Sequence, residues 1–318
     1  TFRFNGAAAV VAMLRGCRGV RSAVPGLLRR SIASLAAASA GNLVRFRGTK
    51  GQSRWGKLLE SDGVSYQAQI LEGVPTEPVL TDQVEVIQQV LAPLPVDPAP
   101  AIIIMGLNYR SHAAETGKDL PRFPVFAFKN PASVIGPDDT IFIPKVAREK
   151  PEVDFEAELA IVLGRALRNA EAGEALDAVL GVTGANDVSA RRWQGKKGGG
   201  QWSRAKSFDT FCPLGPSLVP LQGAAKDLLG SSGLRVQSWV NGQEMQNGST
   251  SDMEFQLGQI LSYLSQGTTL LPGTVILTGT PPGVGYVRDP PVYLHPGDKV
   301  EVELQFAGRL MNPVDAGP

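Results

Sequence analysis

The chain has 318 residues, of which 43% are hydrophobic and 19% charged, and its formal net charge is +1. This composition is typical of a globular protein with a large core, and the near-neutral charge gives no basic footprint for nucleic acid. No apolar run reaches the roughly 18 residues of a membrane span. We therefore expect neither a nucleic-acid partner nor a membrane partner. The two cysteines, Cys17 and Cys212, make neither a disulfide framework nor a zinc knuckle.

The amino end differs in composition from the rest of the chain. Residues 1–40 contain six arginines and four serines, and the first acidic residue is Glu60. An Arg-rich, Ser-containing segment without acidic residues is typical of an organelle transit peptide. We expect residues 1–41 to be a transit peptide or a disordered basic tail. The expected location is the mitochondrial matrix, with the cytoplasm or a plastid as the alternative.

Residues 42–100 predict a small β-rich subdomain. Short apolar runs and the Asp62-Gly63 turn predict strands over 43–46, 55–59 and 64–71. Thr81 as an N-cap, followed by apolar positions 84, 87, 90 and 91, predicts a helix over 81–91. Prolines 93, 95, 98 and 100 then form a stiff linker. We therefore place the main domain at 101–318.

The most informative stretch of that domain is 153–164, which reads as a strand that begins polar and ends apolar. Because side chains alternate along a strand, Asp154, Glu156 and Glu158 share one face. Carboxylates that lead into a buried strand are costly unless a cation meets them. A metal ion held by two carboxylates one pleat apart is one answer. A half-exposed strand with a solvated acidic face is the other.

A candidate proton-transfer pair follows the buried strand predicted at 101–105. His112 and Glu115 are three residues apart, so on a helix they share a face. A histidine held by a carboxylate makes a tuned base near neutral pH, although an ordinary surface pair is the alternative. A mobile loop over 116–124 and a strand over 125–129 come next.

The remaining elements are predicted from periodicity and turn signals. We expect helices over 174–180 and 251–265, a helix that starts in 189–194, and strands over 181–185, 234–240, 275–277 and 300–306. The second helix has Ser251 and Glu254 as a capping box. Asp187 ends the strand over 181–185 and could be either a site residue or a helix N-cap. The glycine-rich segment 195–200 lacks the Gly-Lys-Ser/Thr that a P-loop needs.

Five ordered motifs together resemble one family. They are Gly106-Leu-Asn-Tyr with His112 and Glu115, Asp154-Phe-Glu-Ala-Glu-Leu-Ala, Asn186-Asp-Val-Ser-Ala-Arg, Lys206-Ser-Phe-Asp-Thr-Phe-Cys-Pro-Leu-Gly-Pro and Leu277-Thr-Gly-Thr-Pro-Pro-Gly-Val-Gly. From about residue 102 to the C-terminus, the chain resembles the fumarylacetoacetate hydrolase family. The resemblance implies a β-rich mixed α+β fold built on a mixed β-sheet roll. It also implies a homodimer and a divalent metal, usually Mg²⁺, with Mn²⁺ or Ca²⁺ as alternatives.

The resemblance also assigns expected roles to residues of this chain. The matching metal ligands are Glu156, Glu158 and Asp187. The matching catalytic residues are His112 and Glu115 on a lid, and Lys206 in the site. The matching substrate-binding residues are Arg191, Gln194, Thr280 and Lys129. Arg192 departs from the pattern, because relatives often have Asp there, and this reverses a charge beside the expected site.

The expected chemistry follows from the ligand set. Oxygen-only ligands favour a hard cation with open positions that a 2-oxo acid can chelate. The metal would stabilise an enolate, which proton transfer at C3, decarboxylation and hydrolytic C–C cleavage all share. The last two motifs look closest to a branch associated with mitochondrial oxaloacetate keto–enol tautomerisation, so a tautomerase is expected. The alternatives are a C–C hydrolase of acylpyruvates or related 1,3-dioxo acids, an oxaloacetate decarboxylase, and a non-catalytic metal-binding homologue.

Overall fold

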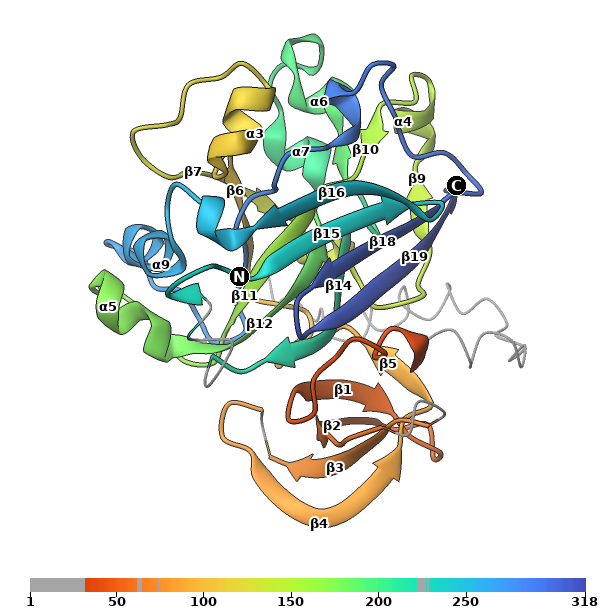
Figure 1. Ribbon diagram of the computed structural model, residues 1–318, viewed down its shortest axis with the longest axis vertical. Coiled ribbons are helices and arrows are strands. Elements are labelled where there is room, and N and C mark those ends of the chain that lie inside the picture. The colour runs from red at the N-terminus through yellow and green to blue at the C-terminus, as the bar shows by residue number, and fades with distance from the viewer. Residues whose placement is uncertain (1–31, 62–64, 74, 222–226, 228) are drawn as a thin grey trace, which may run out of the picture.

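The computed structural model describes residues 32–61, 65–73, 75–221, 227 and 229–318. A large mixed β-sheet packs against a second, five-stranded sheet, and short helices surround the pair (Figure 1). The expected β-rich mixed α+β roll is therefore confirmed. No helix among the described residues is long and apolar enough to cross a membrane.

The strands make up most of the regular structure. They are β1 (Leu43–Arg47), β2 (Ser53–Leu58), β3 (Gln67–Glu72), β4 (Val79–Val86), β5 (Gln89–Leu91), β6 (Ile102–Gly106), β7 (Val125–Lys129), β8 (Val134–Ile135), β9 (Ile141–Ile143), β10 (Val153–Asp154), β11 (Ala157–Leu163), β12 (Val179–Asn186), β13 (Ser189–Ala190), β14 (Cys212–Val219), β15 (Arg235–Val240), β16 (Gln243–Ser249), β17 (Val275–Leu277), β18 (Lys299–Leu304) and β19 (Gly308–Ala316).

The helices are short. The α-helices are α3 (Arg110–Glu115), α4 (Lys145–Arg148), α5 (Ala172–Ala175), α6 (Arg191–Gln194), α7 (Trp202–Lys206) and α9 (Leu257–Ser265). The 3₁₀ turns are η1 (Pro131–Ser133), η2 (Leu176–Ala178), η3 (Lys196–Gly198), η4 (Thr250–Asp252) and η5 (Gly285–Val287).

The large sheet has the strand order β4-β3-β2-β1-β14-β12-β11-β17-β6-β7, and the smaller sheet has the order β16-β15-β18-β19-β9. The large sheet is mixed because β17 runs parallel to β6 and antiparallel to β11. All seven residues of β11 are buried, since the smaller sheet and α9 cover it. The core therefore surrounds the strand that follows the acidic stretch, and it holds that strand in place.

The N-terminal lobe is built from β1 to β5, around a small core of its own. It is continuous with the large sheet, because Leu43 of β1 pairs with Leu218 of β14. Residues 32–41, expected to belong to the leader, pack in this lobe. Leu35 is buried, and the Ser34 carbonyl accepts a hydrogen bond of 2.8 Å from the Arg309 amide. Most of the expected leader, residues 1–31, lies outside the described residues.

The predicted helix over 81–91 is wrong, because this segment forms β4 and β5. Thr81 caps no helix, and its hydroxyl instead donates to the Ile70 carbonyl at 3.0 Å. Val84, expected on a buried helix face, is 51% exposed. The segment is rich in β-branched residues, and its backbone pairs with β3 and β1. Strand pairing therefore prevails over an apolar spacing that fits either structure.

Three other predicted helices are shorter than expected. The segment 251–265 begins with η4, and α9 starts only at Leu257, where Gln259 accepts a hydrogen bond from the Gln256 amide at 2.8 Å. The segment 174–180 is split between α5, η2 and the start of β12. The helix expected in 189–194 begins after the two residues of β13. In each case a neighbouring strand or loop takes over the backbone hydrogen bonds of the missing helical turns.

Candidate metal centre and active site

A break between β10 and β11 creates the acidic cluster. Phe155 and Glu156 lie between the two strands, and the Glu156 amide donates to the Asn186 side chain at 3.0 Å. The Asp187 amide donates in turn to the Glu156 carbonyl at 2.8 Å. These bonds hold the end of β12 against the start of β11. One ligand atom each from Glu156, Glu158 and Asp187 therefore lies within 4.8 Å of the others, and all three residues are buried.

Asp154 does not belong to this cluster. Its carboxylate accepts from Arg191 Nε at 2.8 Å and from the amides of Gly285 and Tyr286 at 2.8 and 3.0 Å. It thus anchors α6 and the loop after β17. The structure divides the acidic stripe into two carboxylates that converge with Asp187 and one supporting residue, as the family pattern implies.

Two buried lysines compensate part of the negative charge. Lys206 Nζ lies 2.5 Å from Glu156 Oε2 and also contacts Asp187, which Lys129 contacts as well. Burial alone would lower the pKa of Lys206, but the Asp187 and Glu156 carboxylates outweigh it and raise that pKa. Burial alone would raise the pKa of Glu156, but Lys206 and Arg191 hold it below its usual range.

Glu158 is different, because no ion pair reaches it among the described residues. Its carboxylate accepts one hydrogen bond, from the Gly279 amide at 2.6 Å. Burial, and then repulsion by Asp187 and Glu156, raise its pKa well above the ordinary value. A buried carboxylate next to two others needs a further positive charge. The all-oxygen donor set and this uncompensated charge fit a hard divalent cation.

The His112–Glu115 pair lies on α3, as expected. His112 Nδ1 is 3.0 Å from Glu115 Oε2, and the other Glu115 oxygen accepts from the Gly283 amide at 2.8 Å. Asp252 accepts from the Ser111 amide at 3.0 Å, at the start of the same helix. Because Glu115 engages Nδ1, the opposite ring nitrogen, Nε2, remains available for proton transfer.

One cavity of about 780 Å³ joins these groups. Of the expected site residues, those that line it are His112, Glu156, Glu158, Arg191, Gln194, Lys206 and Thr280. Arg191 lies 2.6 Å from Glu156 and donates to Gln194 at 2.9 Å. The structure therefore brings the expected metal, catalytic and substrate-binding groups to a single space.

Not every expected residue lines the cavity. Lys129 is buried beside Asp187 and is not part of the cavity wall. The Thr280 hydroxyl donates to the Ala157 carbonyl at 2.9 Å and accepts from Gln246 at 2.7 Å, so its hydrogen is already used. The backbone N–H of Thr280 is the group left to meet a ligand. Arg192 also lies outside the cavity, although Arg191 lines it.

The cavity wall also contains polar and aromatic residues to which the sequence assigned no role, among them Lys118, Lys196, Trp202 and Tyr286. The Arg191 guanidinium lies over the Tyr286 ring, 4.3 Å from the ring centre. Lys118 and Lys196 come from the loops over 116–124 and 195–200. The signal available in the sequence was a lysine in each of two glycine-containing loops beside motif residues.

Comparison with known proteins places the chain in a family. Residues 101–315 match the family model described as fumarylacetoacetate (FAA) hydrolase C-terminal, so the chain belongs to that family. A Xenopus laevis protein named oxaloacetate tautomerase fahd2, mitochondrial, is 45% identical over 221 residues, which are 69% of this chain and 67% of the relative. The Homo sapiens protein named oxaloacetate tautomerase FAHD2A, mitochondrial, is 41% identical over 220 residues, 69% and 68% of the two chains.

Solved structures of other proteins have a similar fold. The crystal structure of 5-carboxymethyl-2-hydroxymuconate delta-isomerase from Mycobacterium smegmatis has a TM-score of 0.72 and 36% identity, and the match covers 87% of this chain and all of the other. That of 2-hydroxyhepta-2,4-diene-1,7-dioate isomerase from Mycobacterium marinum has a TM-score of 0.72 and 34% identity, with 87% and 99% covered.

Proposed function

We propose that this protein is a metal-dependent enzyme that interconverts the keto and enol forms of oxaloacetate. The observation that carries the proposal is that one cavity is lined by His112, which pairs with Glu115, and by Glu156 and Glu158, which form an oxygen-only triad with Asp187. The names of the relatives at 41–45% identity support oxaloacetate as the substrate. Mg²⁺ is the proposed ion, with Mn²⁺ or Ca²⁺ as alternatives that the same donors could accept.

The charge balance favours an anionic substrate. The three carboxylates and the two ammonium groups of Lys129 and Lys206 sum to −1, and a bound dication would change this to +1. The ion would supply stabilisation of the charge that develops on the 2-oxo oxygen. Arg191 and Gln194, which line the same wall, would orient a carboxylate, and the Thr280 backbone N–H is a further donor.

His112 is the proposed base. Its Nε2 takes the proton from C3, the C–H electron pair becomes the C2–C3 double bond, and the carbonyl π pair moves to the oxygen, which takes the proton from the imidazolium to give the enol and neutral His112. The reverse transfer returns the keto form. Glu115 is the proposed partner that orients the ring and stabilises the imidazolium. Lys206 carries the positive charge nearest to the Glu156 and Asp187 carboxylates and would help to stabilise the oxyanion.

A C–C hydrolase is the second candidate, and the size of the cavity favours it. A volume of about 780 Å³ exceeds what a four-carbon diacid fills, so an acylpyruvate or another 1,3-dioxo acid would fit. Decarboxylation of oxaloacetate would use the same groups. A non-catalytic role is disfavoured because His112, Glu156 and Glu158 line the same cavity, with Glu115 bonded to His112 and Asp187 next to the two glutamates.

The deciding experiment follows the ultraviolet decay of freshly dissolved enol-oxaloacetate, with Mg²⁺ and with EDTA. A rate that scales with protein, requires Mg²⁺ and is lost in His112→Ala supports the tautomerase. A sample that binds Mg²⁺ but does not accelerate the decay refutes it. The same sample is then tested on acylpyruvates, where loss of cleavage in His112→Ala would identify the hydrolase.

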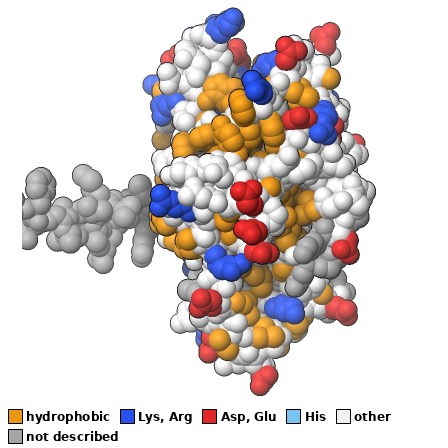
Figure 2. All heavy atoms as spheres, turned by 90° about the vertical axis from the view of Figure 1, so that its left-hand side faces the viewer, with side chains coloured by type: hydrophobic (Ala, Val, Ile, Leu, Met, Phe, Trp, Pro, Cys, Tyr) orange, Lys and Arg blue, Asp and Glu red, His pale blue; other side chains and the backbone are white. Residues whose placement is uncertain are grey.

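The same proposal includes a homodimer. Strand β7 is an edge of the large sheet and pairs only with β6, and Val125, Phe126 and Phe128 are 42%, 44% and 50% exposed. Figure 2 views the molecule from the side on which β7 lies and shows hydrophobic side chains gathered on its surface. An apolar edge strand needs cover. A second copy of the chain is the proposed cover.

Mitochondrial residence is also proposed. It rests on the acid-free, Arg-rich segment 1–40 and on the word mitochondrial in the names of the relatives. A reporter fused behind residues 1–41 is expected to enter mitochondria. The same reporter behind a variant with the six arginines changed to glutamine should stay outside, and equal import of both would contradict the assignment.

A further inference from the structure

A second cavity of about 250 Å³ lies on the other side of α6 and shares no lining residue with the first. It is formed where α4 and the turn after it face α6 and η3. The residues that line it are Val146, Ala147, Glu149, Lys150, Glu152, Ala190, Arg192, Trp193, Lys197 and Gly198. The short helix α6 therefore separates two cavities. Arg191 and Gln194 line one, and Arg192 and Trp193 line the other.

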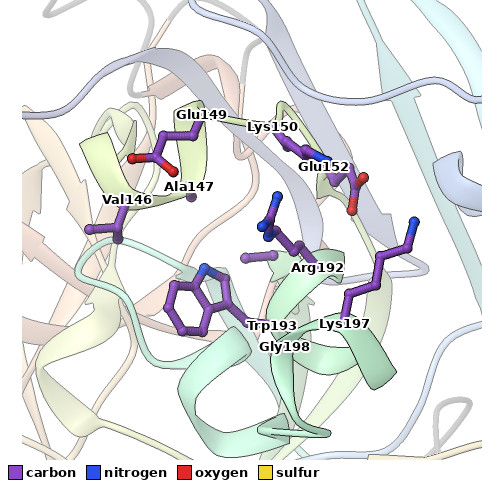
Figure 3. A pocket seen from close by; sticks show the side chains of 10 residues that line it. Val146, Ala147, Glu149, Lys150, Glu152, Arg192, Trp193, Lys197 and Gly198 are labelled. Atoms are coloured by element: carbon purple, nitrogen blue, oxygen red, sulfur yellow. The ribbon is translucent and has the colours of Figure 1, made fainter.

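The polar groups of this cavity are not paired with one another. Among the described ion pairs, none involves Arg192, Lys150 or Lys197, nor either of the two carboxylates, Glu149 and Glu152. Three cations against two carboxylates leave an excess of +1. In Figure 3 the Arg192 guanidinium points into the middle of the cavity, and the carboxylates lie toward its rim.

Trp193 places an aromatic ring in the wall of this cavity. Its indole nitrogen is inaccessible to solvent and has no hydrogen-bond partner, which is costly for a buried polar atom. The ring is held in place by Phe208, at 6.4 Å between ring centres, and by Arg204, at 5.7 Å. Figure 3 shows the nitrogen on the edge of the ring nearer Ala147 and Arg192.

The floor of the cavity is rigid. Gly198 packs so closely on α6 that a Cβ would lie 2.3 Å from the Arg192 carbonyl oxygen and 2.4 Å from the Trp193 Cα. The Arg191 amide donates to the Glu152 carbonyl at 2.8 Å, which ties α6 to the opposite wall. Arg192, Trp193 and Lys197 are thus presented from one fixed unit.

We propose that this cavity binds a small oxyanion, a carboxylate or a phosphate group, through Arg192 and the flanking Lys150 and Lys197, with the Trp193 ring in its wall. A planar guanidinium matches two oxygens of such a group. The net positive charge attracts it, and Glu149 and Glu152 at the rim limit the site to small acids. This site is separate from the metal centre and does not depend on the proposed reaction.

The test uses the full-length chain with Mg²⁺ and follows tryptophan fluorescence during titration with inorganic phosphate and, separately, with succinate. We expect a saturable change with at least one probe, and the probe that gives it identifies the acid group. The change should persist in Trp202→Phe, which alters the first cavity, and disappear in Trp193→Phe.

Arginine variants then assign the site. Arg192→Ala should weaken binding at least tenfold, while Arg192→Lys should retain part of it. Arg148→Ala is the matched control, because Arg148 is on α4 and does not line the cavity; it should bind as the unchanged protein does. Absence of a saturable change with both probes would overturn the proposal, as would a signal that follows Trp202, or equal binding by Arg192→Ala and Arg148→Ala.

Discussion

Glu158→Gln should act in opposite directions on the metal-free and the metal-loaded protein. Glu158 has no ion-pair partner in the described structure, and its pKa is raised by burial and by its two acidic neighbours. The glutamine carbonyl can still accept from the Gly279 amide, and the new N–H₂ can donate to the adjacent carboxylates. Ionising Glu158 therefore costs free energy in the folded protein, and Glu158→Gln should stabilise the metal-free protein near neutral pH by about 1.4 kcal/mol for each unit by which folding raises that pKa.

The metal-loaded protein should respond the other way. Changing groups that only support metal ligands costs roughly 10–100-fold in affinity, so losing a proposed ligand should cost at least about 100-fold. At a metal concentration near 100 times the dissociation constant, the bound ion stabilises a protein by about 2.7 kcal/mol. Glu158→Gln should lose nearly all of this increment.

Asp187→Asn is the matched control, because Asp187 contacts both Lys129 and Lys206. This change leaves buried ammonium charge uncompensated and should destabilise the metal-free protein by roughly 3–5 kcal/mol. The assay is thermal unfolding of both variants with EDTA and across a Mg²⁺ titration, with affinities from calorimetry. The reasoning is refuted if Glu158→Gln is destabilised like Asp187→Asn, or if it keeps the Mg²⁺-dependent rise in Tm.

Three further outcomes are expected. His112→Ala should lower kcat by roughly 10²–10⁴-fold with Mg²⁺ affinity unchanged, and a matching loss of Mg²⁺ binding would show that the residue is structural. Burial raises the pKa of Cys212 to about 12, so in a Cys17→Ser background native protein should resist thiol reagents at pH 8 and react only when unfolded, whereas fast native labelling would contradict this. Phe126→Ser with Phe128→Ser should shift the mass measured by light scattering from dimer to monomer, and an unchanged dimer would exclude β7 from the interface.

The strand period placed Asp154, Glu156 and Glu158 on one face and left open whether a cation or solvent meets them. The family resemblance then selected Glu156, Glu158 and Asp187 as the ligand set. The same period could not show that the strand breaks at residues 155–156, because the break depends on Glu156, whose amide donates to the Asn186 side chain and whose carbonyl accepts from the Asp187 amide. Without it, Asp154 would point with the other two carboxylates.

The helix wrongly predicted over 81–91 shows the same limit, because local spacing does not reveal contacts with other parts of the chain. The apolar spacing in 81–91 fits a helix, yet the backbone pairs with β3 and β1. A pattern read within the segment cannot show these pairings with other strands. Thr280 lines the cavity, and its expected contact with a substrate stays a prediction; the motif could not show that its hydroxyl also bonds Ala157 and Gln246. Arg192 was expected to change the charge beside the active site. Arg192 lines the second cavity instead, and which cavity a residue of α6 faces depends on the elements packed on each side of that helix.

The buried charges explain why Glu158 is the decisive residue. Ion pairs link the others into one alternating chain, Asp154–Arg191–Glu156–Lys206–Asp187–Lys129, in which the sum of charges is zero. Such a chain satisfies itself and needs no ion. Glu158 stands beside it with a charge that Lys206 and the Gly279 amide offset only in part, because burial and the two acidic members Asp187 and Glu156 raise its pKa. A divalent cation among these three would offset Glu158 and leave one positive charge for an anionic substrate, so the lysines allow the metal to attract the substrate instead of merely neutralising the protein.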